Sequence, residues 1–197
     1  MTNETSLSLL ARVTTQPLAA DWERFTTLYE PLIRGWLRKR EVLNHDADDL
    51  AQEILTVVVR KVSSFEHNGR TGAFRTWLRT ITVNCLRDHW RTRRNKPVGA
   101  GGSDMQELIS QLADPESALS RLWDQEHDRY VMQRLLELLE TQFEPKTWLA
   151  FQRFALENIP AAEVAAELGI TSNAVFIAKS RVMARLRQES AGLLDEK

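Results

Sequence analysis

Two amphipathic segments of opposite charge, joined by a short glycine-bearing stretch, occupy residues 46–94. Residues 41–53 contain five acids and no Lys or Arg, whereas residues 70–96 contain eight Lys or Arg and a single acid, Asp88. Apolar residues recur every three or four positions in both segments, which predicts two amphipathic helices. Because charges of opposite sign stand on successive helices, the surface suits two different partners, one of them a polyanion.

Composition favours an all-α protein, since Gly (8) and Pro (6) are scarce in a chain of 197 residues. The net charge of −1 does not argue against nucleic acid as a partner, because phosphates sense charges within a screening length of about 8 Å. Cys85 is the one cysteine, so no disulfide framework is available, and a buried thiol in a reducing cytosol is expected. No apolar run reaches the roughly 18 residues of a membrane span, which predicts a soluble, cytoplasmic protein.

The acids of the first segment have three interpretations. They can cap the helix at Asp46 and complement its dipole, which is the usual role of acids in a first turn. A metal site at residues 45–49 is a weaker alternative, because consecutive residues of one helix diverge whereas hard cations need converging oxygens. The third is a protein-docking face on the polar side of the helix. This side carries Asp49, Gln52, Glu53, Thr56 and Arg60.

Residues 62–73 contain Asn68–Gly69 and Thr71–Gly72 and are predicted to be a loop. The helix that follows, from about Phe74 to Arg91, has an inner apolar stripe. A neighbouring stripe at the same spacing consists of Trp77, Thr80, Asn84, Arg87 and Arg91. Core packing explains such a stripe poorly, whereas unpaired bases stack on aromatic rings and bind amide and guanidinium groups. A solvated basic face with Trp77 half buried is the alternative interpretation.

Residues 95–118 combine a glycine cluster with acids and Pro115, and predict a flexible acidic connector. Beyond it, a helix is expected from Ser117 to Glu140 and another from Pro145. Pro160 begins a short helix, Gly169 supplies a turn, and Thr171 or Ser172 caps a helix that ends near Gln188. This arrangement predicts a helix-turn-helix.

Together the segments DADDLAQEI, GRTGAFRTWLRTITVNCLRDHWR and ENIPAAEVAAELGITSNAVFIAKSRVMARLR resemble bacterial RNA polymerase sigma factors. The resemblance is to the small extracytoplasmic-function (ECF) group of the sigma-70 family, and it extends from Trp22 to Gln188. It implies an all-α chain of two small helical domains joined by a flexible linker. The implied boundaries are an N-terminal arm at 1–20, region 2 at 21–94, an acidic linker at 95–118, the region 4 helix-turn-helix at 119–190, and a tail at 191–197.

The resemblance also implies functional roles. The acidic helix would dock on the clamp helices of the polymerase large subunit through Asp46, Asp49, Gln52 and Glu53. Contacts to the opened minus-10 strand would come from Asn68, Arg70, Arg75, Trp77, Asn84, Arg87, Arg91, Arg93 and Arg94. Contacts to the minus-35 duplex would come from Thr171, Ser172, Asn173, Phe176, Lys179, Ser180 and Arg181. The partners implied are core RNA polymerase, promoter DNA and an anti-sigma protein, with no cofactor, no metal and no catalysis.

The C-terminal helix departs from the family pattern at Phe176 and Ile177, where many members have polar or basic residues. Apolar contact with a thymine methyl group is feasible there, and Ile177 has the alternative of packing against its own domain.

Two rival functions fit less of the chain. A stand-alone helix-turn-helix regulator explains residues 160–187 and leaves the 46–94 block without a role. A metal-dependent phosphohydrolase would rest on His45–Asp46 alone.

Overall fold

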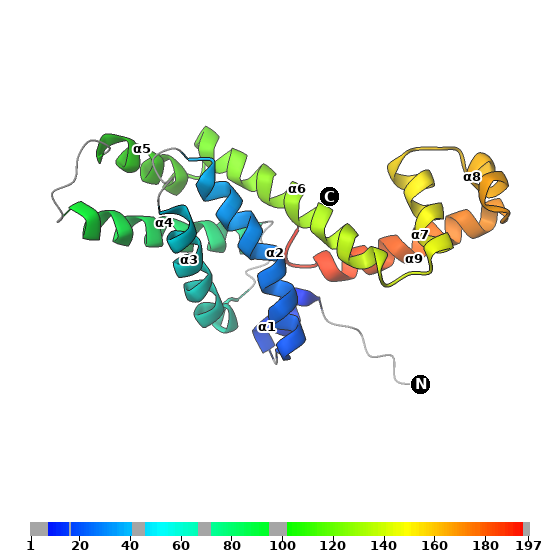
Figure 1. The fold of residues 1–197 in the computed structure, drawn as a ribbon, viewed down its shortest axis with the longest axis horizontal. Helices are drawn as coiled ribbons and strands as arrows, with labels where there is room; N and C mark the ends of the chain where they lie inside the picture. Colours follow the sequence, from blue (N-terminus) through cyan, green and yellow to red (C-terminus); the bar gives the residue numbers. More distant parts are fainter. Residues whose placement is uncertain (1–7, 16, 41–45, 67–71, 95–101, 195–197) are drawn as a thin grey trace.

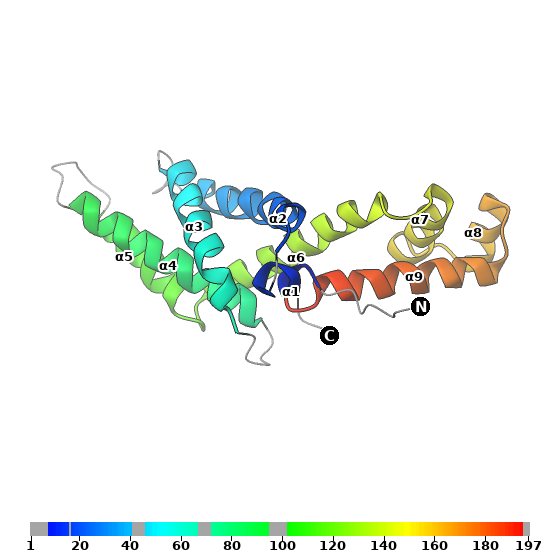
Figure 2. The same cartoon turned by 90° about the horizontal axis from the view of Figure 1, so that it is seen from below.

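The protein is described by a computed structural model that covers residues 8–15, 17–40, 46–66, 72–94 and 102–194. Within these ranges the regular elements are helices and no β-strand forms, which confirms the predicted all-α class (Figure 1). The molecule is elongated, with one group of helices at each end and a long helix, α6, running between them (Figures 1 and 2).

The N-terminal half consists of α1 (Leu9–Thr15), α2 (Ala19–Arg38), α3 (Ala47–Lys61) and α4 (Ala73–Arg94), with a short 3-10 turn at Val62–Ser64. α3 packs against both α2 and α4. The apolar stripe of α4 predicted from the sequence is buried, and it consists of Phe74, Leu78, Ile81 and Cys85.

The C-terminal half consists of α7 (Pro145–Phe151), a π-helical turn at Gln152–Leu156, α8 (Ala161–Leu168) and α9 (Ser172–Ser190). α8 and α9 meet at Gly169, whose φ of 60° and ψ of 46° place it in the left-handed region. The predicted inner stripe of α9 is buried, at Val175, Ala178, Val182 and Leu186.

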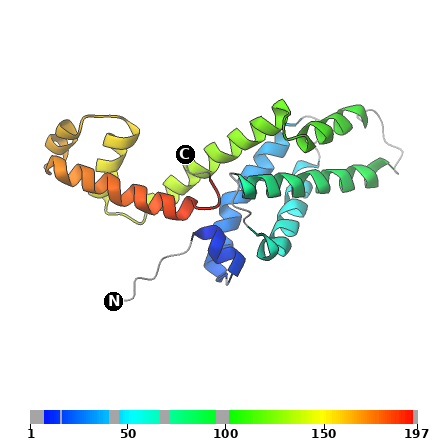
Figure 3. The same cartoon turned by 180° about the vertical axis from the view of Figure 1, so that it is seen from behind.

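α6 (Ala118–Glu140) joins the two halves. It packs against α2, α4 and α5 near its start and against α9 further along (Figure 3). One large cluster of buried side chains therefore extends from α1 to α9, and a small second cluster fills the α8–α9 corner.

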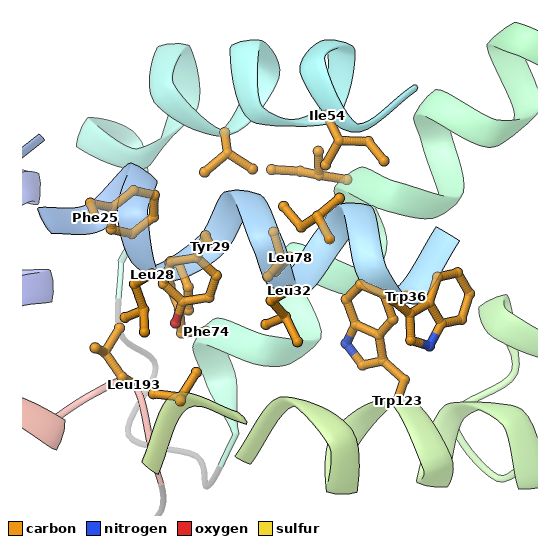
Figure 4. Packing of buried hydrophobic residues seen from close by; sticks show 14 of the residues in the cluster. Phe25, Leu28, Tyr29, Leu32, Trp36, Ile54, Phe74, Leu78, Trp123 and Leu193 are labelled. Atoms are coloured by element: carbon orange, nitrogen blue, oxygen red, sulfur yellow. The ribbon is translucent and has the colours of Figure 1, made fainter. Parts of the chain in front are cut away.

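Aromatic rings fix the crossing of α2 and α4 (Figure 4). The ring of Phe74 lies 5.4 Å from that of Tyr29 and 6.1 Å from that of Phe25, in edge-to-face geometry. Tyr29 is fully buried, and burial raises the pKa of its hydroxyl well above its ordinary value. Edge-to-face pairs at these distances contribute about 1 kcal/mol each beyond the area they bury, so this cluster sets the direction of α4.

The N-terminal arm and the tail both contribute side chains to the core. The arm at 1–20 contains α1, because Leu9, Leu10 and Val13 are buried against α2 and the turn after α3. The tail also enters the core, since Leu193 is 1% exposed and lies beside Leu28 in Figure 4. An internal proline usually interrupts a helix, at a cost of roughly 3 kcal/mol. The helix α2 nevertheless runs through Pro31, because its buried stripe outweighs that cost.

The segment 95–118 was predicted to be a flexible connector, and the structure places the helix α5 (Gly102–Ala113) within it. The apolar residues of α5 are spaced for one face, and Met105, Leu108, Ile109 and Leu112 are buried. This face packs against α4 and α6. The acids and glycines of this segment predicted a flexible connector, but its buried apolar stripe makes residues 102–113 a helix.

Among the described residues, no single helix is both long and apolar enough to cross a membrane. The pair α8 and α9 meets that criterion only when taken together, with a bend of 102° between them.

The corner between α8 and α9 can be tested at Gly169. Replacing Gly169 by Ala forces a Cβ into the left-handed region, and we expect the free energy of unfolding to fall by about 1 kcal/mol. No other group lies within 4 Å of the added Cβ, so the cost is conformational. Denaturant unfolding measures the change.

Gly35→Ala is the matched control, because Gly35 lies within α2 and its added Cβ also meets nothing within 4 Å. Alanine is preferred in a helix, so this variant should gain up to about 1 kcal/mol. Equal stability of Gly169→Ala and wild type would contradict the left-handed turn.

Candidate functional site

The predicted polar stripe lies on the outer side of α4. The side chains of Thr80, Asn84, Arg87 and Arg91 are exposed, while the stripe through Cys85 is buried. Arg91 is paired with Asp88 at 3.0 Å, but both side chains are more than half exposed, so this contact contributes little stability. The outer side of α4 therefore presents an amide and two guanidinium groups to an external ligand.

Trp77 is half buried at the start of this stripe. Its ring lies 5.3 Å from that of Phe65 and 5.4 Å from that of Phe74. The half-burial expected for Trp77 in the alternative interpretation is present: part of the indole packs on the aromatic cluster, and the remainder is open to solvent. The two phenylalanines hold the exposed part in a fixed position.

Other members of the predicted minus-10 set have different surroundings. Asn68 and Arg70 lie outside the described residues, and Arg93 and Arg94 lie in α4 but their side chains are not described. Arg75 points toward α6, where its Nη1 is 3.1 Å from a carboxylate oxygen of Asp128. Arg75 is 14% exposed, so the structure does not bring it onto the open surface with Asn84 and Arg87.

Gly72 allows the side chain of Arg75 to fold back. A Cβ at Gly72 would lie 2.6 Å from the guanidinium carbon of Arg75, and Gly72 has a φ of 71°. A side chain at position 72 would therefore displace Arg75 from α6.

The sequence did not predict the hollow between α4 and α5, which has a volume of about 310 Å³. It is lined by Arg87, Trp90, Gln106, Ile109 and Ser110. Its α4 wall adjoins the predicted stripe. The signal for its α5 wall is the apolar spacing of Met105, Leu108 and Leu112, which predicts a helix within a segment whose glycines and acids favour a connector.

The acidic face of α3 separates into two groups. Asp49, Gln52 and Glu53 are exposed. Asp46 is turned inward, with Oδ2 3.5 Å from Nε2 of His89 on α4. The exposed group is the part of the predicted docking face that is open to a protein partner.

Asp48 is paired within the chain and does not belong to the open part of the predicted docking face. Arg38 donates two hydrogen bonds to Asp48, at 3.0 and 2.8 Å, and these bonds lower the pKa of the carboxyl below its ordinary value. They tie the start of α3 to the end of α2.

The pair α8 and α9, for which a helix-turn-helix was predicted, has the predicted cap. The hydroxyl Oγ1 of Thr171 accepts a hydrogen bond from the backbone N–H of Ala174 at 3.1 Å. Thr171 thus holds the start of α9 in place. The remaining predicted minus-35 residues are exposed on α9: Ser172, Asn173, Phe176, Lys179, Ser180 and Arg181.

Phe176 packs against Phe154 while remaining largely open. Its side chain is 52% exposed, and the two rings meet edge to face at 5.2 Å. Nζ of Lys179 lies 5.1 Å from the centre of the Phe154 ring. Ile177 is 43% exposed, so part of its side chain is open to solvent and part is covered.

The protein is helical, with a polar and basic face on α4, an acidic face on the adjacent α3, and a helix pair, α8 and α9, in the C-terminal half. Residues 25–96 match the family model described as Sigma-70 region 2. This range contains most of α2, all of α3 and all of α4. The match covers less than half of the chain, identifies this segment as a sigma-70 region 2 domain, and supports a sigma factor of the sigma-70 family. No curated protein and no solved structure matches the chain.

The buried side of α4 can be tested through Cys85, the one thiol of the chain. Burial raises the pKa of Cys85 from 9.0 to about 11. At about pH 8 the thiolate fraction is then lower by about 100-fold, and thiolate is the reactive form. We expect reaction with a disulfide reagent to be slower than in the unfolded chain by at least about that factor.

The same shift predicts how stability depends on pH. The unfolded thiol loses its proton near its ordinary pKa of 9.0, whereas the folded thiol keeps it to about 11. This contribution is therefore fully present below the lower value and is lost as the pH rises between the two. Equal thiol reactivity in the folded and unfolded chain would contradict the burial of this face.

Proposed function

We propose that the chain is a promoter-specificity subunit of bacterial RNA polymerase, of the extracytoplasmic-function group, acting in the cytoplasm without catalysis of its own. The observation that carries this proposal is the match of residues 25–96 to sigma-70 region 2 together with the outward polar stripe of α4. The helix-turn-helix of α8 and α9 extends the proposal to a second DNA contact.

The α4 stripe suits an opened strand better than duplex DNA. A half-exposed indole at Trp77 is available for stacking on an unpaired base, and Asn84 can bind a base edge. Arg87 and Arg91 add positive charge next to it for the phosphates. Capture of unstacked bases on this face would favour strand opening at the minus-10 element. Asn68, Arg70, Arg93 and Arg94 are proposed to extend the same contact.

The exposed side of α3 is proposed to bind the core polymerase. Asp49, Gln52 and Glu53 form an exposed polar surface. Asp48, by contrast, is paired with Arg38 of α2. A fixed acidic helix face is suited to a basic protein surface, and charge complementarity of this kind fixes orientation.

The C-terminal half is proposed to bind the minus-35 duplex through the start of α9. The largest apolar group there is Phe176, which is suited to contact with a thymine methyl group. Asn173, Lys179 and Arg181 are the polar candidates for base edges and phosphates.

Transcription by the reconstituted holoenzyme tests the proposal. Core polymerase with the wild-type chain should initiate at specific sites on genomic DNA of the source organism, mapped by sequencing the 5′ ends of the transcripts. Because an amide or guanidinium contact to an unpaired base contributes about 1–3 kcal/mol, Asn84→Ala and Arg87→Ala should each lower initiation by about tenfold or more.

Arg24→Ala is the control, since Arg24 is an exposed cation on α2, away from the stripe. It should initiate as well as wild type. Unchanged initiation by both α4 variants would reject the strand-binding role. A chain that binds a specific duplex tightly without polymerase, and adds nothing to polymerase, would instead be a stand-alone regulator.

A further inference from the structure

The first half of α6 turns its carboxylates toward cations of α2 and α4. Glu126 accepts a hydrogen bond from Nζ of Lys39 at 2.7 Å, and its other oxygen is 3.9 Å from Arg40. Glu126 is 18% exposed. These contacts join residues 86 or 87 positions apart in the sequence, so they form only when α6 lies on the N-terminal half.

Two arginines of α4 complete this surface. Nη1 of Arg79 lies 2.9 Å from an oxygen of Asp124, and Arg79 is 8% exposed. Arg75 lies between Asp124 and Asp128, at 3.6 and 3.1 Å. The cationic surface of α2 and α4 thus has two parts. Arg75 and Arg79 of α4 face Asp124 and Asp128, whereas Lys39 and Arg40, which follow the end of α2, face Glu126.

Two aromatic contacts seat α6 on this cationic surface. The rings of Trp36 and Trp123 meet edge to face at 4.7 Å, as Figure 4 shows. His127 is buried, with Nδ1 2.9 Å from Oδ1 of Asp128 and Nε2 3.4 Å from the hydroxyl of Tyr29. Trp123 and His127 share the side of α6 that faces the N-terminal half, with Glu126 on one flank of this side and Asp124 and Asp128 on the other. Docking of the helix therefore places carboxylates against cations on both flanks.

Ion pairs of Arg12 also join the two halves of the molecule near α1. Arg12 donates from Nε to Asp21 at 2.7 Å and lies 3.3 Å from Glu189 of α9 through Nη2. Burial alone would raise the pKa of Asp21, yet its hydrogen bonds from Arg12 and from the N–H of Leu18 hold that pKa below its ordinary value. The end of α9 is therefore also fastened to the N-terminal half.

We propose that the cationic surface of α2 and α4 is a docking site shared by α6 and single-stranded DNA, with the α6 carboxylates standing where phosphates of the strand would bind. This inference rests on the proposed function, and it adds Arg75, which the resemblance places among the minus-10 contacts, to the residues that bind the opened strand. The structure is then the closed form of the chain, in which Arg75 is occupied by Asp124 and Asp128. Binding of a strand at Arg75 requires the first half of α6 to leave.

Variants that neutralise the carboxylates test the competition in the full-length chain. Asp124→Asn with Asp128→Asn keeps the side-chain shapes and removes the charges that hold Arg75. Binding of a short fluorescein-labelled DNA strand of mixed sequence is measured by anisotropy. We expect the double variant to bind about tenfold more tightly than wild type, because the competent form is more populated. Adding Arg75→Gln should remove the gain.

Glu137→Gln with Glu140→Gln is the matched control, since it removes the same charge from the far end of α6, where both side chains are exposed or partly exposed. It should bind within about twofold of wild type. Hydrogen exchange gives the second measurement: saturating the wild-type chain with the strand should speed amide exchange at residues 120–128.

Equal affinity of the two charge-matched variants would overturn the competition, as would unchanged exchange of residues 120–128 in the DNA-bound chain. If no variant binds the strand while the holoenzyme still initiates transcription, this inference fails and the proposed function stands. If the holoenzyme does not initiate at specific sites, the proposed function itself fails.

Discussion

The packing of Phe74 against the rings of α2 is the interaction on which the rest of the structure depends. Phe74 contacts Phe25 and Tyr29 on one side and Phe65 and Trp77 on the other. Because α4 is a rigid helix, fixing its first turn fixes the direction of every later residue. The buried stripe through Cys85 and the exposed stripe through Asn84 are both consequences of this one cluster. The region 2 surface thus depends on aromatic packing, with the charges arranged around it.

The charged side chains fall into two groups. Some form ion pairs with another helix of the chain, and others remain exposed and available to a partner. Asp48 and Asp124 both carry negative charge, yet each is held by arginines of another helix. Asp49 and Glu53 remain exposed on α3. The net charge of −1 is therefore a sum in which an acidic face and a basic face, on adjacent helices, nearly cancel. Such a division suits a subunit that binds both a protein and a nucleic acid.

The sequence predicted the parts of this fold that depend on local periodicity. The helical class, the inner stripes of α4 and α9, and the Thr171 cap follow from spacing within one segment, and the structure confirms them. One missed feature, α5, has a local signal in the apolar spacing of residues 102–113, whereas the others depend on contacts between distant segments. The order of α1 and of the tail at Leu193 comes from burial against α2, and the position of Arg75 comes from acids about 50 residues away. No periodicity within a single segment carries that information.

Binding to core RNA polymerase is the most direct test of the central claim, that this chain acts as a polymerase subunit through α3. The affinity of the purified chain for bacterial core polymerase would be measured beside Asp49→Ala/Glu53→Ala, with Asp104→Ala/Glu107→Ala on α5 as the control of equal charge. The account predicts that wild type and control bind alike and that the α3 variant binds more weakly, by about tenfold or more. Absence of binding by the wild-type chain to an active core preparation would contradict the account.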